Sequence, residues 1–497
     1  MKMIKNNKWL LLVALTILAC SDDETVVVNN TSDGLPLTAG SADFSKFVSL
    51  GNSLTAGYCD NALFIEGQAN SYPAILADQF ALVGGGEFKI PYTNDNTGGL
   101  LLGGNVIAGP RLYFNGSGPA PVTGIPTTEV SSVLAGPFNN MGVPGAKSFH
   151  LLAPGYGNVA GVATGQANPY FVRFATSPSA TILADASAQD PTFFSLWIGN
   201  NDVLGYATSG GSGTNQTGNF NPATYGPNDI TDPNVFANVY STLVDGLTAN
   251  GAKGVVANLP YVTTIPFFTT VPYNPVPLDA ATAGLLNSGF AQYNNGLLLA
   301  QSFGLITADE VARRTISFSA SATNRVVMVD SYLTNLSSLG IPSYRQATAE
   351  DLVVLPARTF IGSVVGGNPT QINGVSVPLA DNWVLSKDEI QEIKTATDAY
   401  NATIQSIASA KGLAFVDANA LMTRVANGGI TADNFTVTST YVTGGGFSLD
   451  GVHPSPRGYA LISNEFIKAI NATYGSNFKG VNIGTYRILY PENPNNF

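Results

Sequence analysis

The chain has 497 residues, of which 44% are hydrophobic and only 11% charged, so it can bury a sizeable core and global disorder is excluded. The formal net charge is −11 and no stripe of Lys and Arg is visible, which argues against nucleic acid as a partner. With two histidines and two cysteines, the chain cannot form zinc fingers, His-rich metal sites or a disulfide framework.

The N-terminus has the pattern of a lipoprotein signal peptide, which we assign to residues 1–19. Three lysines precede an apolar run from Trp9 to Ala19, which is too short to span a bilayer because a spanning helix needs about 20 residues. The run ends in Ile17–Cys20, which looks like a bacterial lipobox and predicts lipid attachment at Cys20. The alternative is an ordinary secretory signal that happens to contain Cys.

Residues 20–42 are expected to be the lipid anchor and a flexible tether. The acidic run at 21–24 resembles the export signals of bacterial surface lipoproteins, and the rest is polar without a period. No later segment has 18 uninterrupted apolar residues, so no further membrane crossing is expected. The predicted location is the cell envelope, as an outer-membrane lipoprotein, with exposure at the cell surface as one alternative.

Short apolar runs alternate with helical patterns along the rest of the chain. Strands are expected at 47–50, 193–198, 254–259 and 413–416, helices at 73–80, 235–247, 387–411 and 456–470, and a further candidate helix near 280–303. This alternation predicts an α/β fold: a three-layer, doubly wound, flavodoxin-like and mostly parallel sheet. Ligands bind at the carboxyl ends of strands in such folds, where Gly51 and Gly199 lie.

The two histidines, His150 and His453, limit the choice of general base for a metal-free hydrolase with a serine nucleophile. His453 follows Asp450 by three residues, so the carboxylate can fold back and accept the imidazole Nδ1–H. This leaves Nε2 free to take a proton. His150 has no carboxylate close in sequence, which favours a structural role or at most a place in the site lining.

Four short motifs, in order along the chain, resemble blocks of the SGNH (GDSL-type) hydrolases. They are residues 50–58 for the first block, 140–145 for the second, 199–202 for the third and 450–453 for the fifth. Each motif alone arises often by chance, whereas four in family order are specific. The resemblance implies a serine esterase or lipase, in bacterial lipoprotein form, that hydrolyses carboxylic esters through an acyl-enzyme and needs no cofactor.

Carried over by position, the resemblance assigns Ser53 as nucleophile, His453 as base and Asp450 as its orienter. It places the backbone amides of Ser53 and Gly145 and the side-chain amide of Asn201 in the oxyanion hole. At Gly145 the absence of a Cβ would let the backbone approach closely. No metal ligand is implied. The substrate is an ester of a lipid, an acylated carbohydrate or a small alcohol.

The chain departs from the family pattern in two ways. Asn52 stands where the family usually has Asp, so the charge of that carboxylate is absent. The motifs also need only part of a hydrolase domain that we assign to residues 43–475. The residues of this domain that the motifs do not need are expected to form long loop insertions, at about 83–139, 155–190, 205–232 and 261–385. A C-terminal tail at 476–497 is expected to follow the domain.

Two other classes of function remain open. The first is a non-catalytic surface lipoprotein that uses the same fold to bind glycan or another partner. The second is a Ca²⁺-dependent protein that uses Asp95, Asp229 and Asp232, although these turns lack EF-hand spacing. If Cys20 carries lipid, Cys59 has no partner and is expected to be a small buried hydrophobe.

Overall fold

The structure, a computed structural model, describes residues 34–493, and its centre is a five-stranded parallel sheet in the order β17–β8–β7–β1–β6. The signal peptide, Cys20 and most of the expected tether lie outside the described residues. The strands are β1 (Phe47–Gly51), β6 (Asn140–Gly142), β7 (Phe193–Trp197), β8 (Lys253–Ala257) and β17 (Ala414–Val416). Numbered along the chain, their order is 2-1-3-4-5, the flavodoxin-like order whose ligand site lies where β1 meets β7.

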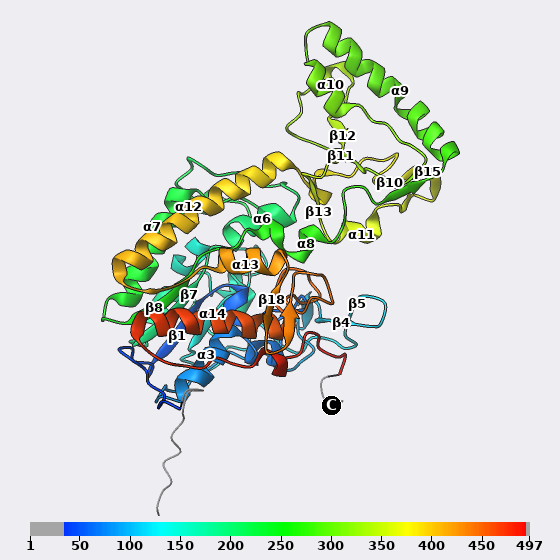
Figure 1. Cartoon of the computed structure of the whole chain (residues 1–497). Helices are drawn as coiled ribbons and strands as arrows, with labels where there is room; N and C mark the ends of the chain where they lie inside the picture. The colour runs from blue at the N-terminus through cyan, green and yellow to red at the C-terminus, as the bar shows by residue number, and fades with distance from the viewer. Residues whose placement is uncertain (1–33, 494–497) are drawn as a thin grey trace, which may run out of the picture.

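Helices cover both faces of this sheet (Figure 1). On one side lie α7 (Pro233–Thr248) and α12 (Lys387–Lys411), and on the other lie α3 (Tyr72–Ala81) and α14 (Pro456–Tyr474). Every residue of β1 and β7 is consequently buried, which explains why both strands read as continuous apolar runs rather than as an alternating pattern.

Most of the expected elements are confirmed. The strands at 47–50, 193–198, 254–259 and 413–416 correspond to β1, β7, β8 and β17, and the helices correspond to α3, α7, α12 and α14. The candidate helix near 280–303 is α9 (Ala280–Ser302). The sequence did not indicate β6 as a strand or α13 (Ala418–Ala426) as a helix. The three residues of β6 are too few to establish a period, whereas α13 has nine residues, with its buried ones at helical spacing.

Much of the remaining chain forms small elements around the sheet. The helices are α1 (Ser53–Ala56), α2 (Ile65–Ala69), α4 (Pro169–Val172), α5 (Ile182–Ser187), α6 (Asn201–Thr208) and α8 (Pro266–Thr269). The two-stranded ribbons pair β2 (Leu100–Leu102) with β3 (Asn105–Ala108), β4 (Leu112–Phe114) with β5 (Pro119–Pro121), and β18 (Ile430–Ala432) with β19 (Phe435–Val437). Within residues 34–493, none of the helices has the length and apolarity needed to cross a bilayer.

The chain between α8 and α12 forms a unit that projects away from the sheet (Figure 1). Its helices are α9, α10 (Ala308–Arg314) and α11 (Ala357–Phe360). Its strands are β9 (Val276–Leu278), β10 (Ser321–Asn324), β11 (Val327–Val329), β12 (Tyr344–Gln346), β13 (Leu352–Val353), β14 (Val364–Val365), β15 (Asn368–Ile372) and β16 (Val384–Leu385).

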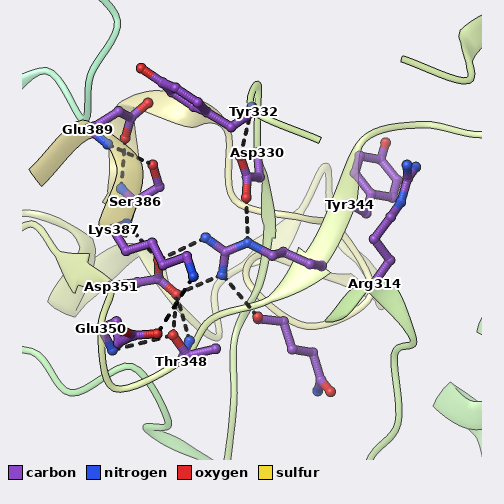
Figure 2. A network of polar contacts seen from close by, with 12 residues as sticks. Arg314, Asp330, Tyr332, Tyr344, Thr348, Glu350, Asp351, Ser386, Lys387 and Glu389 are labelled. Atoms are coloured by element: carbon purple, nitrogen blue, oxygen red, sulfur yellow. Dashed lines mark hydrogen bonds and ion pairs between the residues drawn. The ribbon is translucent and has the colours of Figure 1, made fainter. Parts of the chain in front are cut away.

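A buried ion-pair network holds this projecting unit to the sheet domain. The guanidinium of Arg345 donates to the carboxylates of Asp330 and Asp351. Asp351 also accepts the backbone N–H of Lys387, the first residue of α12, and Figure 2 shows it beside Ser386, which caps that helix. Because each charge has its partner at hydrogen-bond distance, the network fixes the unit at the N-terminus of α12.

The two ends of the described chain pack onto the sheet domain. Ser41 donates its backbone N–H to the carbonyl of Tyr474 at 2.8 Å, so the packed part begins before residue 42. At the other end, Tyr490 is buried against Phe64. The guanidinium of Arg111 donates to the backbone carbonyls of Pro491 and Glu492, which follow Tyr490 in the chain. The C-terminal segment thereby supports the loop that follows α1.

Candidate active site

Ser53 lies at the carboxyl end of β1, as the first residue of the short helix α1. Asn52 caps this helix, because its Oδ1 accepts the backbone N–H of Leu54 at 3.0 Å. The Nδ2 of Asn52 donates to Oδ1 of Asn200, in the loop after β7, at 3.2 Å. One amide side chain thus supplies an acceptor and a donor and ties the two loops together, which an ionised carboxylate at this position could not do.

His453 and Asp450 lie on the loop before α14 and meet Ser53 across the end of the sheet. His453 Nε2 is 2.9 Å from Ser53 Oγ, and His453 Nδ1 is 2.9 Å from Asp450 Oδ2. The Asp450 carboxylate also accepts the backbone N–H groups of Val452 and His453, each at 2.8 Å. The carboxylate therefore fixes both the loop and the imidazole ring, with Nε2 facing the serine.

The electrostatic environment keeps Asp450 ionised. Burial by itself would raise the pKa of Asp450, but the charge of His453 and the hydrogen bonds from His453 and Val452 lower this pKa to about 2. An ionised carboxylate stabilises a positive imidazolium next to it. The arrangement thus suits a histidine that accepts a proton from a hydroxyl.

The loop after α1 also holds Asp450, a contact that no motif in the sequence indicates. The backbone N–H of Asn61 donates to Asp450 Oδ2 at 3.0 Å, and the side chain of Asp60 accepts the N–H of Leu449 at 2.9 Å. Ser448 links the backbone of Asp60 to the carboxylate of Asp450, because its Oγ accepts the backbone N–H of Asp60 and donates to Asp450 Oδ1. Positive φ angles at Asp60 and Asn61 aim this loop at the site, and such angles are typical of Asp and Asn in turns.

Asp60 is buried in this network. Burial raises the pKa of Asp60, the N–H of Leu449 opposes the rise, and the negative charge of Asp450 adds to it, for a value of about 7. Asp60 and Asp450 are therefore not equivalent: at neutral pH the first titrates while the second stays ionised.

Gly145 and Asn201, the other predicted members of the oxyanion hole, lie in the loops that follow β6 and β7. Asn201 is the first residue of α6, and its Nδ2 donates to the carbonyl of Ala146 at 2.9 Å, which leaves its second N–H for a ligand. Among the described residues, no acceptor takes the backbone N–H of Ser53 or Gly145. Gly145 has a φ of +81°, and a Cβ there would meet only a side-chain nitrogen at 3.8 Å. The backbone conformation, rather than close approach, therefore requires glycine.

We expect Asn201→Ala to lower kcat by about 10²–10³-fold with little change in KM, because it removes a donor that meets the developing oxyanion. Measuring kcat and the thermal midpoint on the same preparation separates this role from a structural one. A lowered midpoint with normal kcat per folded molecule would remove Asn201 from the catalytic group.

His150 has the structural role that its sequence context favours. Its Nδ1 accepts the backbone N–H of Lys147 at 3.0 Å, and its ring stacks on Tyr156 with centroids 4.4 Å apart. Burial, and secondarily the charge of Lys147, lower the pKa of His150 to about 4. The imidazole of His150 therefore stays neutral at any pH above about 5.

Because His150 does not change charge between pH 5 and 8, we expect the fall of kcat/KM towards acid pH to come from the general base His453, with Asp60, whose pKa is about 7, as the other group in this network that titrates in that range. A protonated His453 cannot accept the serine proton, so activity is lost as the pH falls. His150→Gln should retain this acid limb in a full pH–rate profile. An active His150→Gln protein without the limb would show that the base was wrongly assigned.

The alternative Ca²⁺ site receives no support from the contacts of its three aspartates. Asp229 accepts from Thr214, Gln216 and Gly226. Asp232 caps α7, and Asp95 binds the hydroxyl of Thr127. Between residues 34 and 493, no three His, Cys, Asp or Glu side chains are grouped so that they could hold a metal ion. These carboxylates order loops of the chain itself.

Cys59 is buried, and its burial raises the pKa of its thiol well above the usual value. The thiol therefore stays protonated and packs with Ala62 and Phe64 as a small apolar group.

Comparisons with known proteins give distant structural similarity. No protein-family model matches the chain, and no curated protein matches it. One similar solved structure is a mutant of an acetyl-xylooligosaccharide esterase from Geobacillus, with 11% identity over 87% of this chain and 96% of that one, at a TM-score of 0.31. Another is an extracellular lipase from Streptomyces rimosus, with 12% identity over 86% and 99%, at a TM-score of 0.28. These scores are too low to support a conclusion about function.

Proposed function

We propose that the protein is a serine-type carboxylic ester hydrolase of the SGNH (GDSL-type) class, with Ser53, His453 and Asp450 as its triad. The observation that carries the proposal is the hydrogen-bonded chain from Asp450 through His453 to Ser53, with both distances 2.9 Å, at the carboxyl end of β1. Nucleophile, base and orienting carboxylate are recognised by this geometry rather than by their order in the sequence.

The proposed reaction has two half-reactions. Ser53 Oγ attacks the ester carbonyl carbon while His453 Nε2 takes the hydroxyl proton, and Asp450 stabilises the imidazolium. The N–H groups of Ser53, Gly145 and Asn201 donate to the oxyanion. The tetrahedral intermediate then expels the alcohol, which receives the proton from His453, and leaves an acyl-enzyme. Water attacks the acyl carbon with His453 again as base, and the acid and free Ser53 are released.

A panel of p-nitrophenyl esters tests this proposal. An ester hydrolase releases p-nitrophenolate at a rate proportional to enzyme concentration, and the release depends on Ser53. A non-catalytic surface protein that binds glycan or another partner gives no such release.

We also infer that the sheet and its two helix layers form a three-layer hydrolase domain of this class. The segments at about 83–139, 155–190, 205–232 and 261–385 would be insertions into it. In support, three of the five strands, β1, β6 and β7, carry or directly precede motif residues, whereas the unit containing α9 projects from the sheet (Figure 1).

We propose that Cys20 anchors the protein to the cell envelope, as its lipobox-like context suggests. Cys20→Ala should then block lipid attachment and move the protein from the membrane fraction to the soluble fraction. Fractionation of cells followed by immunoblotting measures this shift. Membrane association that is unchanged in the variant would exclude the lipid anchor.

A further inference from the structure

An apolar pocket opens at Ser53 and His453, which belong to its lining. Its cavity volume is about 100 Å³. The walls come from α13, α14, the loop after β8 and the segment before α14. Apolar side chains that form them include Leu54, Trp197, Leu421, Met422, Val425 and Phe447.

The helix α13 gives the pocket a fixed wall. Asp417 caps α13 by accepting the N–H of Ala420 at 2.9 Å, and Asn258, after β8, donates to the same carboxylate at 2.9 Å. Leu421, Met422 and Val425 are each less than 9% exposed and line the pocket from one side of this helix. This wall of the pocket is therefore held in place by contacts within the chain itself.

Polar side chains line the pocket only at its catalytic end. They are Ser53 and His453 together with Asn52, Asn200 and Asn201. The rest of the lining offers no hydroxyl, amide or charged side chain, so the hydroxyl groups of a sugar would lose their hydrogen bonds to water there. An alkyl chain has no such groups to satisfy and is favoured by leaving water.

We propose that this pocket binds the acyl chain of the substrate, so that the natural substrates are esters of medium- or long-chain fatty acids rather than acetyl esters. The inference rests on the proposed ester hydrolysis. The acyl group stays bonded to Ser53 through both half-reactions, whereas the alcohol leaves and water replaces it. A buried apolar pocket suits the group that stays, and the open side of the site suits the exchange of alcohol for water.

The first test varies the acyl chain on one leaving group, using p-nitrophenyl esters from acetate to palmitate and the purified full chain. Each methylene that enters the pocket should raise kcat/KM by a factor of up to about four. We expect at least a tenfold rise from acetate to octanoate, ending when the pocket is full. A second series, acetate esters of alcohols of increasing length, should show no comparable rise. Preference for acetate in the first series, or an equal rise in the second, would overturn the proposal.

The second test changes the wall at Met422. Met422→Trp should shift the preferred acyl length downwards by filling the pocket, and Met422→Ala should shift it upwards. Met328→Ala is the matched control, because Met328 is a buried methionine (1% exposed) in β11 of the projecting unit. It should leave the preferred length unchanged even if stability falls.

The readout is the ratio of kcat/KM for octanoate to that for acetate, because partial unfolding lowers both values by the same factor. A ratio unchanged in both Met422 variants would overturn the acyl-pocket assignment. If no ester is hydrolysed in a Ser53-dependent way, the proposed function itself fails. If hydrolysis depends on Ser53 but not on acyl length, only the acyl pocket fails.

Discussion

Ser53→Ala is expected to lower kcat for a p-nitrophenyl ester by about 10⁴–10⁶-fold, because no acyl-enzyme can form without Oγ. The residual rate would come from binding and from the donors of the oxyanion hole. The hydroxyl makes its hydrogen bond to His453, which is 2.9 Å away, so the substitution removes little that holds the fold. The thermal midpoint should therefore change little.

Ser49→Ala is a suitable control for Ser53→Ala, because Ser49 is a buried serine in β1, the strand that leads to Ser53, and its Oγ is 2.6 Å from Ser195 Oγ. It should leave kcat unchanged whatever its effect on stability. Undiminished turnover in the Ser53 variant would exclude the proposed nucleophile, and the activity would then have to belong to another residue or to a contaminant.

Asp450→Asn should lower kcat by about 10⁴-fold. An amide at this position can donate to His453 Nδ1, which favours the tautomer that carries its proton on Nε2. That nitrogen then cannot accept the proton of Ser53. The backbone N–H of Asn61 points at the same carboxylate oxygen as Nδ1, so an amide nitrogen placed there would also face a donor.

The pH–rate profile adds a second readout for Asp450. Its pKa of about 2 keeps the Asp450 carboxylate ionised at every pH above about 4. The pH–rate profile of the native protein should therefore show no acid limb from Asp450 above that pH. Asp433→Asn, which alters an exposed carboxylate bonded to the N–H of Ile483, should leave kcat unchanged. Normal turnover in Asp450→Asn would mean that His453 needs no carboxylate to orient it.

The sequence predicts best those features that are local. The capping box of Ser386 and Glu389 marks the start of α12, and the buried apolar runs mark β1 and β7. The spacing of Asp450 and His453 likewise predicts their contact, because three residues of one loop can fold back on each other.

Contacts between residues that are far apart in the chain have no comparable signal in the sequence. The bond from Asn61 to Asp450 connects positions 389 residues apart, and neither position shows a pattern that refers to the other. The pocket depends on α13, a nine-residue helix whose buried residues are spaced as one helix face, although that spacing does not say what the face packs against. The sequence could therefore indicate the reacting groups, but not the cavity that would choose the substrate.

The distance along the chain between nucleophile and base has a consequence for biosynthesis. His453 is synthesised 400 residues after Ser53, and the segment around Tyr490 that supports the loop after α1 comes later still. A growing chain thus carries an ordinary serine hydroxyl with no base beside it. The proposed catalytic group would be complete only once the segment that carries His453 has been synthesised and has packed at the end of β1. Fragments that end before His453 would hydrolyse nothing, however well they fold.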